Sequence, residues 1–324
     1  MRRVTLKDLA RATGVSVSTV SLALRGDERI SQATTARVQV AADRLGYRGD
    51  FAGSLLRVGN PRILGLVARL DQELHSRYHE RILVEAKEHG WQVIVVPTSP
   101  SRDVADAVSF LATCRARAVV LIDPPGGAVP RDCPGPVVIA QAGPDFCDLV
   151  TSDCAPGLAQ LGAALSRAGR RRWLYLDGPE GTSARVRRSG VLAAARGVGA
   201  DVVVRPAGAT FDDGYAALLE PAEAGCDAVV AYNDHCAHGA MVALWRRGRQ
   251  IPCDVAVAGV DNIASSRGQA WRLTSVDRNV EEVAAQAFRI AVRRADEPDA
   301  PVSRVRIATR LRERSSTLGA AGGT

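Results

Sequence analysis

The chain contains near its N-terminus the stretch VTLKDLARATGVSVSTVSLALRG, residues 4–26. Apolar residues recur at helical spacing on both sides of a glycine, first as Leu6, Leu9 and Ala10 and then as Val20, Ala23 and Leu24. Thr5 and Asp8 predict a capping box at the start of the first helix, and Gly14 predicts its left-handed end. Ser16 predicts the cap of the second helix. Two short helices across so tight a turn must cross steeply, which is the geometry of a helix-turn-helix.

A third helix is predicted from Ser31 to Leu45, with one apolar face made of Val38, Ala41, Ala42 and Leu45. The second helix exposes short side chains that suit contact with base edges or thymine methyl groups, namely Val17, Ser18, Ser21 and Leu22. From the residues alone, a three-helix bundle that binds protein stays open as the alternative.

The positive charge of the chain is concentrated in this N-terminal segment. Residues 1–60 hold ten basic and five acidic side chains, and the whole chain has a net charge of +7. A small basic head on a nearly neutral body indicates a polyanion-binding module joined to a second domain. A solvated basic surface without a partner is the alternative.

The length and composition of the chain narrow its class. Its 324 residues predict about two domains. No apolar run approaches the roughly 18 residues of a transmembrane helix, and no apolar stretch follows the basic residues at the N-terminus. We therefore expect no membrane partner and a cytoplasmic location. The seven cysteines are scattered without a C-x-x-C pair, so neither a disulfide framework nor a zinc knuckle is expected.

The rest of the chain alternates short β-rich runs with helical patterns. The predicted strands are Ile63–Val67, Val93–Val96, Ala118–Ile122, Val137–Ile139, Trp173–Leu176, Val202–Val204, Ala228–Tyr232 and Val255–Val260. The helical patterns include His75–His89, Val104–Cys114, Gly157–Ala168, Arg185–Ala195 and His235–Arg246. This alternation indicates α/β domains, and eight strands suit two doubly wound parallel sheets better than one.

Ligands of such sheets bind beyond the carboxyl ends of the strands. The polar residues that follow the predicted strands are Arg69, Asp123, Gln141, Asp177, Asn233, Asp234, Asp261 and Asn262. We therefore predict a ligand site built from members of this set.

Enzyme motifs are mostly absent. The sequence contains no phosphate-binding loop of the G-x-x-x-x-G-K-[ST] type, no strand-coupled G-x-G-x-x-G and no G-x-S-x-G. His75 and His79 have the spacing of metal ligands, but Ser76 stands where a zincin has glutamate. His235 and His238 fit ordinary positions near a helix N-terminus. The sequence therefore predicts neither catalysis nor a metal or cofactor.

Residues 4–21 closely resemble the lactose-repressor (LacI/GalR) family of bacterial transcription regulators. Further motifs that resemble this family are Arg37-Val38, Leu45-Gly46-Tyr47, Leu56-Arg57, Leu64-Gly-Leu-Val67, Gly90-Trp91, Asn233-Asp234, Gly239-Ala240, Asp254-Val-Ala-Val257, Gly259-Val-Asp261 and Leu273-Thr274. The head motif is highly specific, and the likeness extends over nearly the whole chain.

The resemblance implies a DNA-binding head at residues 1–47, a hinge helix within a linker at 48–61 and a periplasmic-binding-protein-like core at 62–318. It divides the core into an N subdomain, about 62–152 plus 277–303, and a C subdomain, about 153–276 plus 304–318. The implied function is that of a repressor that binds a pseudo-palindromic operator in double-stranded DNA as a dimer, under the control of a small effector held between the subdomains. Assembly beyond the dimer stays open. The Gly- and Ala-rich residues 319–324 are predicted to form a disordered tail.

The resemblance also implies roles for single residues in DNA binding. Val17, Ser18 and Ser21 match positions that read base edges in the major groove. Positions that contact phosphates match Thr5, Ser16, Thr19, Ser31 and Thr34. Leu56 matches the hinge leucine that wedges into the minor groove, where an apolar side chain unstacks a base step. Leu22 replaces the arginine that is commonest at its position.

In the core, Arg187, Asn233 and Asp261 match effector-binding positions, and Asp123 and Gln141 align with further positions of the same pocket. The sequence departs from the family after the first strand of the core, where Arg69 and His75 occupy places that usually hold acidic and aromatic residues. The usual sugar contacts are therefore expected to be lost there.

The substitution at Arg69 raises a question about the effector. Arg69 and Arg187 would repel each other across one enclosed space unless an anion or a carboxylate lies between them. Asp261 or Asp123 is one candidate for that carboxylate. An anionic effector, such as a phosphorylated sugar or a carboxylate metabolite, is the other, whereas a neutral sugar is the family's commonest ligand.

Two other functions are alternatives to the repressor. A solute-binding protein with the same core and no catalytic activity would not need the basic head. An enzyme on a Rossmann-like fold would need a nucleophile with its base, or a cofactor site, and neither is visible in the sequence.

Overall fold

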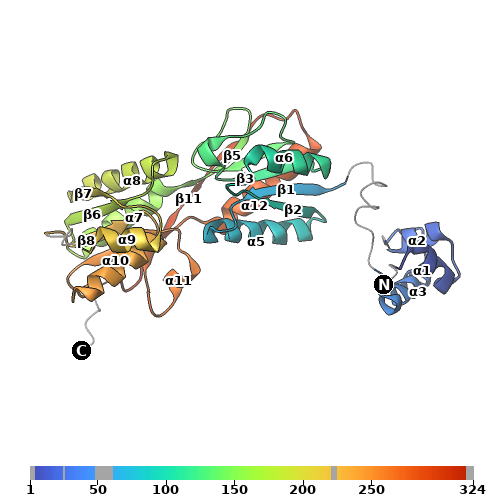
Figure 1. Cartoon of the computed structure of the whole chain (residues 1–324), viewed down its shortest axis with the longest axis horizontal. Coiled ribbons are helices and arrows are strands. Elements are labelled where there is room, and N and C mark those ends of the chain that lie inside the picture. Colours follow the sequence, from blue (N-terminus) through green and yellow to red (C-terminus); the bar gives the residue numbers. More distant parts are fainter. Residues whose placement is uncertain (1–3, 25, 48–60, 220–224, 319–324) are drawn as a thin grey trace. The chain divides into compact units, whose positions relative to one another are not determined.

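The computed structural model describes residues 4–24, 26–47, 61–219 and 225–318. The chain separates into two compact units, residues 1–61 and residues 62–324 (Figure 1). The first unit is the head and the second is the core. No helix among the described residues is long and apolar enough to cross a membrane.

The head consists of the helices α1 (Leu6–Thr13), α2 (Val17–Leu24) and α3 (Gln32–Leu45). The predicted capping box is present, since the Thr5 hydroxyl accepts the Asp8 amide and the Asp8 carboxylate accepts the Thr5 amide. Gly14 ends α1 with φ 68° and ψ 21°, in the left-handed conformation that glycine adopts without strain. The helix-turn-helix predicted from the sequence is confirmed.

One small apolar cluster holds these three helices together. Its fully buried members are Leu9, Val20, Ala23, Val38 and Ala42. They come from the faces that the helical spacing predicts, and Leu6, Ala10, Leu24, Ala41 and Leu45 pack against them. The opposite face of α2 is therefore free to meet a partner.

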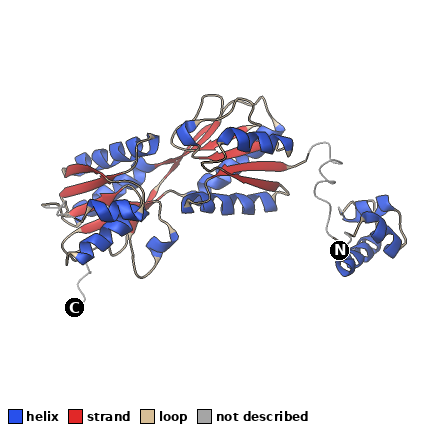
Figure 2. Ribbon diagram, viewed as in Figure 1, coloured by secondary structure: helices blue, strands red, loops and turns tan. Residues whose placement is uncertain are grey.

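The core contains two six-stranded sheets covered by helices (Figure 2). The first has the strand order β11-β5-β4-β3-β1-β2, with β1 (Ile63–Ala68), β2 (Gln92–Pro97), β3 (Ala118–Ile122), β4 (Pro136–Ile139), β5 (Asp148–Asp153) and β11 (Arg304–Ala308). The second has the order β12-β10-β9-β8-β6-β7, with β6 (Arg172–Asp177), β7 (Asp201–Pro206), β8 (Ala228–Ala231), β9 (Ala256–Val260), β10 (Thr274–Asp277) and β12 (Arg310–Arg312). Every pairing is parallel except β10 with β12.

Helices bury both faces of each sheet. In the first sheet, α5 (Glu73–Glu88) and α12 (Val280–Asp296) share one apolar cluster with the strands, and α6 (Val104–Thr113) contacts β1 and β2. In the second sheet, α7 (Cys154–Arg167) and α8 (Thr182–Val198) cover one face. The other face is covered by α9 (Phe211–Ala217) and α10 (Asp234–Arg246), and the short α11 (Ala264–Arg267) follows β9. The predicted fold, two doubly wound α/β subdomains behind a helix-turn-helix head, is confirmed.

The sheets correct the prediction in two respects. Four strands, β5, β10, β11 and β12, were not among the eight predicted. In addition, β11 pairs with β5 in the first sheet, although residues 304–318 were predicted to belong to the C subdomain. The third crossing between the sheets, predicted between residues 303 and 304, lies instead between Ala308 and Arg310.

Candidate DNA-binding surface and ligand cleft

The exposed face of α2 presents the residues predicted to read bases. Val17 is 41% exposed, Ser18 is exposed, and Ser21 and Leu22 are half-buried at the edge of the same face. All four side chains are short, so α2 has no long side chain on this face that would hold a groove at a distance. The arrangement suits insertion of α2 into a major groove.

The residues predicted to contact phosphates lie at helix N-termini. The Ser16 hydroxyl accepts the Thr19 amide at 3.0 Å, and Ser31 accepts the Thr34 amide at 3.3 Å. Such ends combine free amide donors with the positive end of the helix dipole and therefore favour phosphate. The Thr5 hydroxyl differs in its partner, since it donates to the Asp8 carboxylate at 2.7 Å, whereas the Ser31 hydroxyl donates to the Thr34 hydroxyl at 2.9 Å. Leu56 and the predicted hinge at residues 48–60 lie outside the described residues.

A cleft of about 860 Å³ opens between the two sheets of the core. All seven residues predicted to bind the effector line it: Arg69, His75, Asp123, Gln141, Arg187, Asn233 and Asp261. Asp177, Asp234 and Asn262, the other members of the predicted polar set, are not part of the lining. Residues from both sheets therefore meet in one cleft at the carboxyl ends of the parallel strands, where ligands of such sheets bind.

The lining has a buried floor and an exposed rim. We call the buried residues His75, Arg187, Asn233, Asp261 and Arg278 the floor, and the exposed charged residues Arg69, Asp123, Glu180 and Arg185 the rim. The distinction matters because charges on the floor are shielded from water, whereas charges on the rim are screened.

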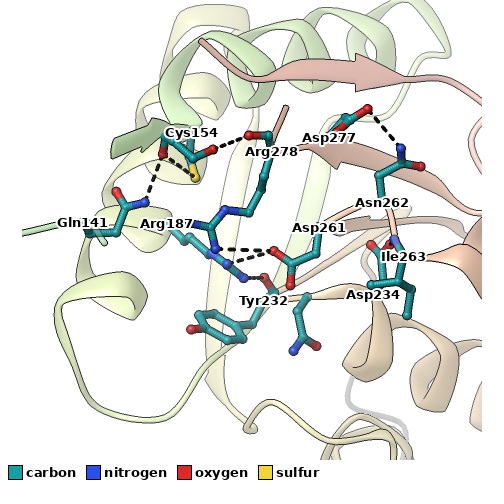
Figure 3. A network of polar contacts seen from close by, with 12 residues as sticks. Gln141, Cys154, Arg187, Tyr232, Asp234, Asp261, Asn262, Ile263, Asp277 and Arg278 are labelled. Carbon is teal, nitrogen blue, oxygen red and sulfur yellow. Dashed lines mark hydrogen bonds and ion pairs between the residues drawn. The ribbon is translucent and has the colours of Figure 1, made fainter. Parts of the chain in front are cut away.

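Arg187 and Asp261 form the central ion pair of the floor (Figure 3). Arg187 Nη2 donates to Asp261 Oδ1 at 3.0 Å, and Nη1 donates to the carbonyl oxygen of Tyr232 at 2.6 Å. The Arg187 guanidinium also lies 4.3 Å from the centre of the Tyr232 ring. These contacts fix the arginine in one orientation toward the cleft.

Arg278 is a floor residue that the sequence did not reveal. It follows β10, is 8% exposed, and places Nη1 3.8 Å from the same Asp261 Oδ1 (Figure 3). Its carbonyl oxygen accepts the Ser152 hydroxyl at 2.8 Å, and the Ser152 carbonyl accepts Gln141 Nε2 at 3.0 Å. The signal that points to Arg278 is its place after a strand, but the short strand Thr274–Asp277 was itself not predicted.

His75 contributes a neutral donor to the floor. Its Nδ1 accepts the Arg69 amide at 3.1 Å, which assigns the ring proton to Nε2. Burial lowers the pKa of His75 to about 4, and the positive charges of Arg278 and Arg69 act in the same direction. The imidazole is therefore uncharged at neutral pH.

Asn233 has a structural role in addition to its place on the floor. Its Oδ1 caps α10 by accepting the Cys236 amide at 2.9 Å, and its Nδ2 donates to the carbonyl oxygen of Ala209 at 2.8 Å. Both polar atoms thus hold the side chain in place at the cleft surface. Each keeps one further hydrogen-bonding position.

The expected repulsion between Arg69 and Arg187 is relieved by two separate carboxylates. Asp261 neutralises Arg187, which agrees with one of the two carboxylates that the sequence offers. Arg69 pairs with Asp71, at 2.7 Å between Nη2 and Oδ2, a partner that the sequence analysis does not predict. Because Arg69 is exposed at the rim, no anion is needed to bridge it to Arg187.

Backbone strain collects where the strands end at the cleft. Asp123 follows β3 with φ 44°, Asp261 and Asn262 follow β9 with φ 106° and 50°, and Asn279 follows β10 with φ 55°. Non-glycine residues adopt such values rarely and at some cost in energy. The four residues include two of the predicted cleft carboxylates.

Asp234 belongs to a buried network behind the cleft. Its carboxylate accepts the hydroxyls of Ser275 at 2.6 Å and Ser266 at 2.7 Å, and the Ile263 amide at 2.9 Å. Burial raises the pKa of Asp234 to about 7. His238 Nε2 lies 3.2 Å from the same Ser266 hydroxyl, yet all three side chains are buried and the carboxylate binds the serine rather than the histidine. The arrangement is structural and is not a catalytic triad.

One group of potential metal ligands stands out in the described part of the chain, Glu85 with Glu88 and His89. Glu85 is already paired with Arg81, and His89 Nδ1 contacts the Glu85 carbonyl oxygen at 2.8 Å. Glu88 and His89 are exposed. The group thus has the character of a surface cluster at the end of α5 rather than of a built metal site.

Comparison with known proteins agrees with this geometry. Residues 5–50 match the bacterial regulatory proteins of the lacI family, and residues 163–317 match a periplasmic binding protein-like domain. The chain is 27% identical over 328 residues to the HTH-type transcriptional regulator PtxS of Pseudomonas plecoglossicida, covering 97% of this chain and 96% of that protein. It is 26% identical over 335 residues to the ribose operon repressor of Escherichia coli K12, covering 96% of this chain and 99% of that protein.

Among solved structures, the lac repressor dimer bound to operator and the anti-inducer ONPF has the same fold, with a TM-score of 0.81 at 20% identity, covering 98% of this chain and 100% of that chain. The fold and the two surfaces define a DNA-binding regulator with a ligand-binding core. The chain belongs to the lacI family of bacterial regulatory proteins. It is a DNA-binding transcriptional regulator, as the head motif predicted.

Proposed function

We propose that this chain is a repressor that binds a pseudo-palindromic operator as a dimer and changes its affinity for that operator when a small effector fills the cleft. The observation that carries the proposal is the cleft itself. Seven residues chosen from the sequence, from both subdomains, converge on one cavity of about 860 Å³ in a chain whose head is a helix-turn-helix.

The partners follow from the chemistry of the two surfaces. The base-reading roles of Val17, Ser18 and Ser21 and the phosphate roles of Ser16 and Thr34 agree with their places on α2 and at helix ends. The similar lac repressor structure holds operator DNA as a dimer. A two-fold dimer reads two half-sites, so the operator must be close to a palindrome.

We assign the cleft a binding role without catalysis, and place the protein in the cytoplasm, where its DNA lies. The family consists of regulatory DNA-binding proteins. Among the described residues that line the cleft, no hydroxyl is hydrogen-bonded to a histidine or a carboxylate, so no activated nucleophile is assembled there.

The test combines two measurements on the full chain. Footprinting on the DNA upstream of its own gene should show a pseudo-palindromic protected site, with half-sites about one helical turn apart. A thermal-shift screen of metabolites should then find a compound that alters this protection. A chain that binds a metabolite but protects no DNA would instead be a solute-binding protein, which is the alternative function.

A further inference from the structure

Arg278 is a buried cation whose partners are incomplete. The residue is more than nine-tenths buried and lines the cleft. Its one ion pair is the 3.8 Å contact with Asp261, and its Nε has no hydrogen-bond partner among the described residues. A buried guanidinium normally satisfies its donors, since leaving them unmet costs free energy.

Asp261 cannot neutralise both arginines of the floor. Its Oδ1 accepts Arg187 at 3.0 Å and is the atom closest to Arg278 as well. His75 is neutral, so the floor has two positive charges and one negative charge. The remaining charged residues of the lining are Arg69, Asp123, Glu180 and Arg185, all at the exposed rim, where they balance in sign and are screened by water.

A second feature favours an anion in the same cleft. The N-terminus of α8, a helix of 17 residues, opens on the cleft through Gly181, Thr182, Ser183 and Ala184. Gly181 provides no side-chain cap, so the first amides of α8 have no side chain to accept them. The unmet amides and the positive end of the helix dipole both attract negative charge.

We propose that the effector is a monoanion, a hydroxyl-bearing carboxylate such as a sugar acid, whose carboxylate completes the contacts of Arg278. This inference rests on the proposed function and specifies the ligand of the same cleft. A single carboxylate balances the single excess charge of the floor, whereas a phosphate monoester would bring nearly two negative charges. Asp261, Gln141 and Asn233 remain to accept and donate hydrogen bonds with the hydroxyl groups of the effector.

The test measures binding of matched compounds to the full-length protein by calorimetry. The compounds are neutral aldoses, the aldonic and uronic acids with the same carbon skeletons, and the corresponding sugar phosphates. We expect at least one sugar acid to bind at least tenfold more tightly than both its neutral and its phosphorylated counterparts. Tighter binding of a neutral sugar or of a sugar phosphate would overturn the proposal, as would a panel in which no sugar acid binds.

Two variants test whether the carboxylate of the effector binds at Arg278. Arg278→Gln should weaken binding of the acid at least tenfold, and Arg196→Gln, which removes an exposed arginine in the last turn of α8, outside the cleft lining, should change it less than threefold. Equal losses in the two variants would overturn the assignment to Arg278. The comparison of compounds on the unaltered protein stands even if Arg278→Gln does not fold.

Operator binding, followed in parallel, separates this inference from the proposed function. A protein that binds its operator and responds to a neutral sugar would retain the proposed function and lose the inference. A protein that binds a sugar acid but no operator would lose the proposed function instead.

Discussion

Asp261 serves two sides of the core at once. Its carboxylate faces the cleft and holds Arg187 and Arg278, while its carbonyl oxygen accepts Arg77 Nη1 from α5 of the first subdomain at 3.2 Å. Its backbone has φ 106°, a value that costs a non-glycine residue some strain. Asp261 thus joins the ligand site, through its side chain, to the contact between the subdomains, through its backbone.

Removing this charge should destabilise the core. Asp261→Asn leaves two buried arginines without a carboxylate, and breaking a buried pair costs about 3 kcal/mol or more. Asp71→Asn, which breaks the exposed pair with Arg69, should cost less than about 1 kcal/mol. Urea denaturation measures both free energies of unfolding, and equal losses would contradict the role assigned to the floor.

His75 makes stability depend on pH. Its pKa is lowered to about 4 in the folded protein, from an ordinary value of 6.5. Between these values the unfolded chain binds a proton that the folded chain does not, so His75 lowers stability as pH falls from 6.5 to 4. The loss should reach about 2 to 3 kcal/mol at pH 4.

The contribution of His75 is isolated by comparison with His75→Gln. Burial also lowers the pKa of His238 to about 4, which acts in the same direction, and the raised pKa of Asp234 acts in the opposite one. The difference in unfolding free energy between the two proteins should therefore narrow as pH falls from 7 to 4, provided His75→Gln is the less stable of the two at pH 7. A difference in unfolding free energy that stays constant with pH would mean that His75 has the same pKa in the folded and the unfolded protein.

At the level of elements, the head could be predicted almost residue by residue because its signals are local. Caps at Thr5, Ser16 and Ser31 and apolar spacing within short helices decide its structure. In the core, strands with continuous apolar runs were found and polar strands were not. Ser275 and Thr274 of β10 are buried, but their hydroxyls are satisfied by Asp234 and by the carbonyl oxygen of Arg314, distant partners that no local pattern shows.

The residues of the cleft divide in the same way, into those that follow predicted apolar strands and those that do not. Residues after apolar strands, such as Asp123 and Asp261, were identified by position, whereas Arg278 follows β10 and was missed with it. The strand β11 was missed because Arg304 and Arg306 alternate with apolar residues along an edge of the sheet. The Asp71 partner of Arg69 is an exposed contact within one loop, which spacing alone does not reveal.

Packing between α9 and α10 depends on the absence of side chains at Gly214 of α9 and Gly239 of α10. A Cβ at Gly239 would lie 1.9 Å from the carbonyl oxygen of Phe211, so Gly239→Ala must push the two helices apart. We expect a loss of about 3 kcal/mol, at the upper end of the usual range for overpacked cores. Gly197 lies exposed in α8 with nothing within 4 Å of a Cβ, and Gly197→Ala should stabilise the protein by about 1 kcal/mol. Thermal melting of the two variants should show shifts of opposite sign, and a shift of the same sign would contradict this packing.

At the level of the whole molecule, the head makes two kinds of contact with DNA, and one binding assay can distinguish them. Phosphate contacts bind any DNA and weaken steeply with salt, whereas base contacts distinguish the operator. Ser18→Ala should therefore lower the affinity for the operator more than that for random DNA, and Thr34→Ala should lower both alike. Fluorescence anisotropy at two salt concentrations measures the affinity of each variant, and of the unaltered protein, for the operator and for random DNA. Equal losses for Ser18→Ala on both DNAs would contradict a role in base reading.

In the proposed function, occupation of the cleft controls DNA binding by the head. The most direct measurement is the affinity of the full-length protein for its operator as the concentration of an effector identified by calorimetry is raised, with random DNA titrated in parallel. A saturating effector should change operator affinity at least tenfold, with a smaller change for random DNA. Operator affinity that stays constant while the effector fills the cleft would contradict it.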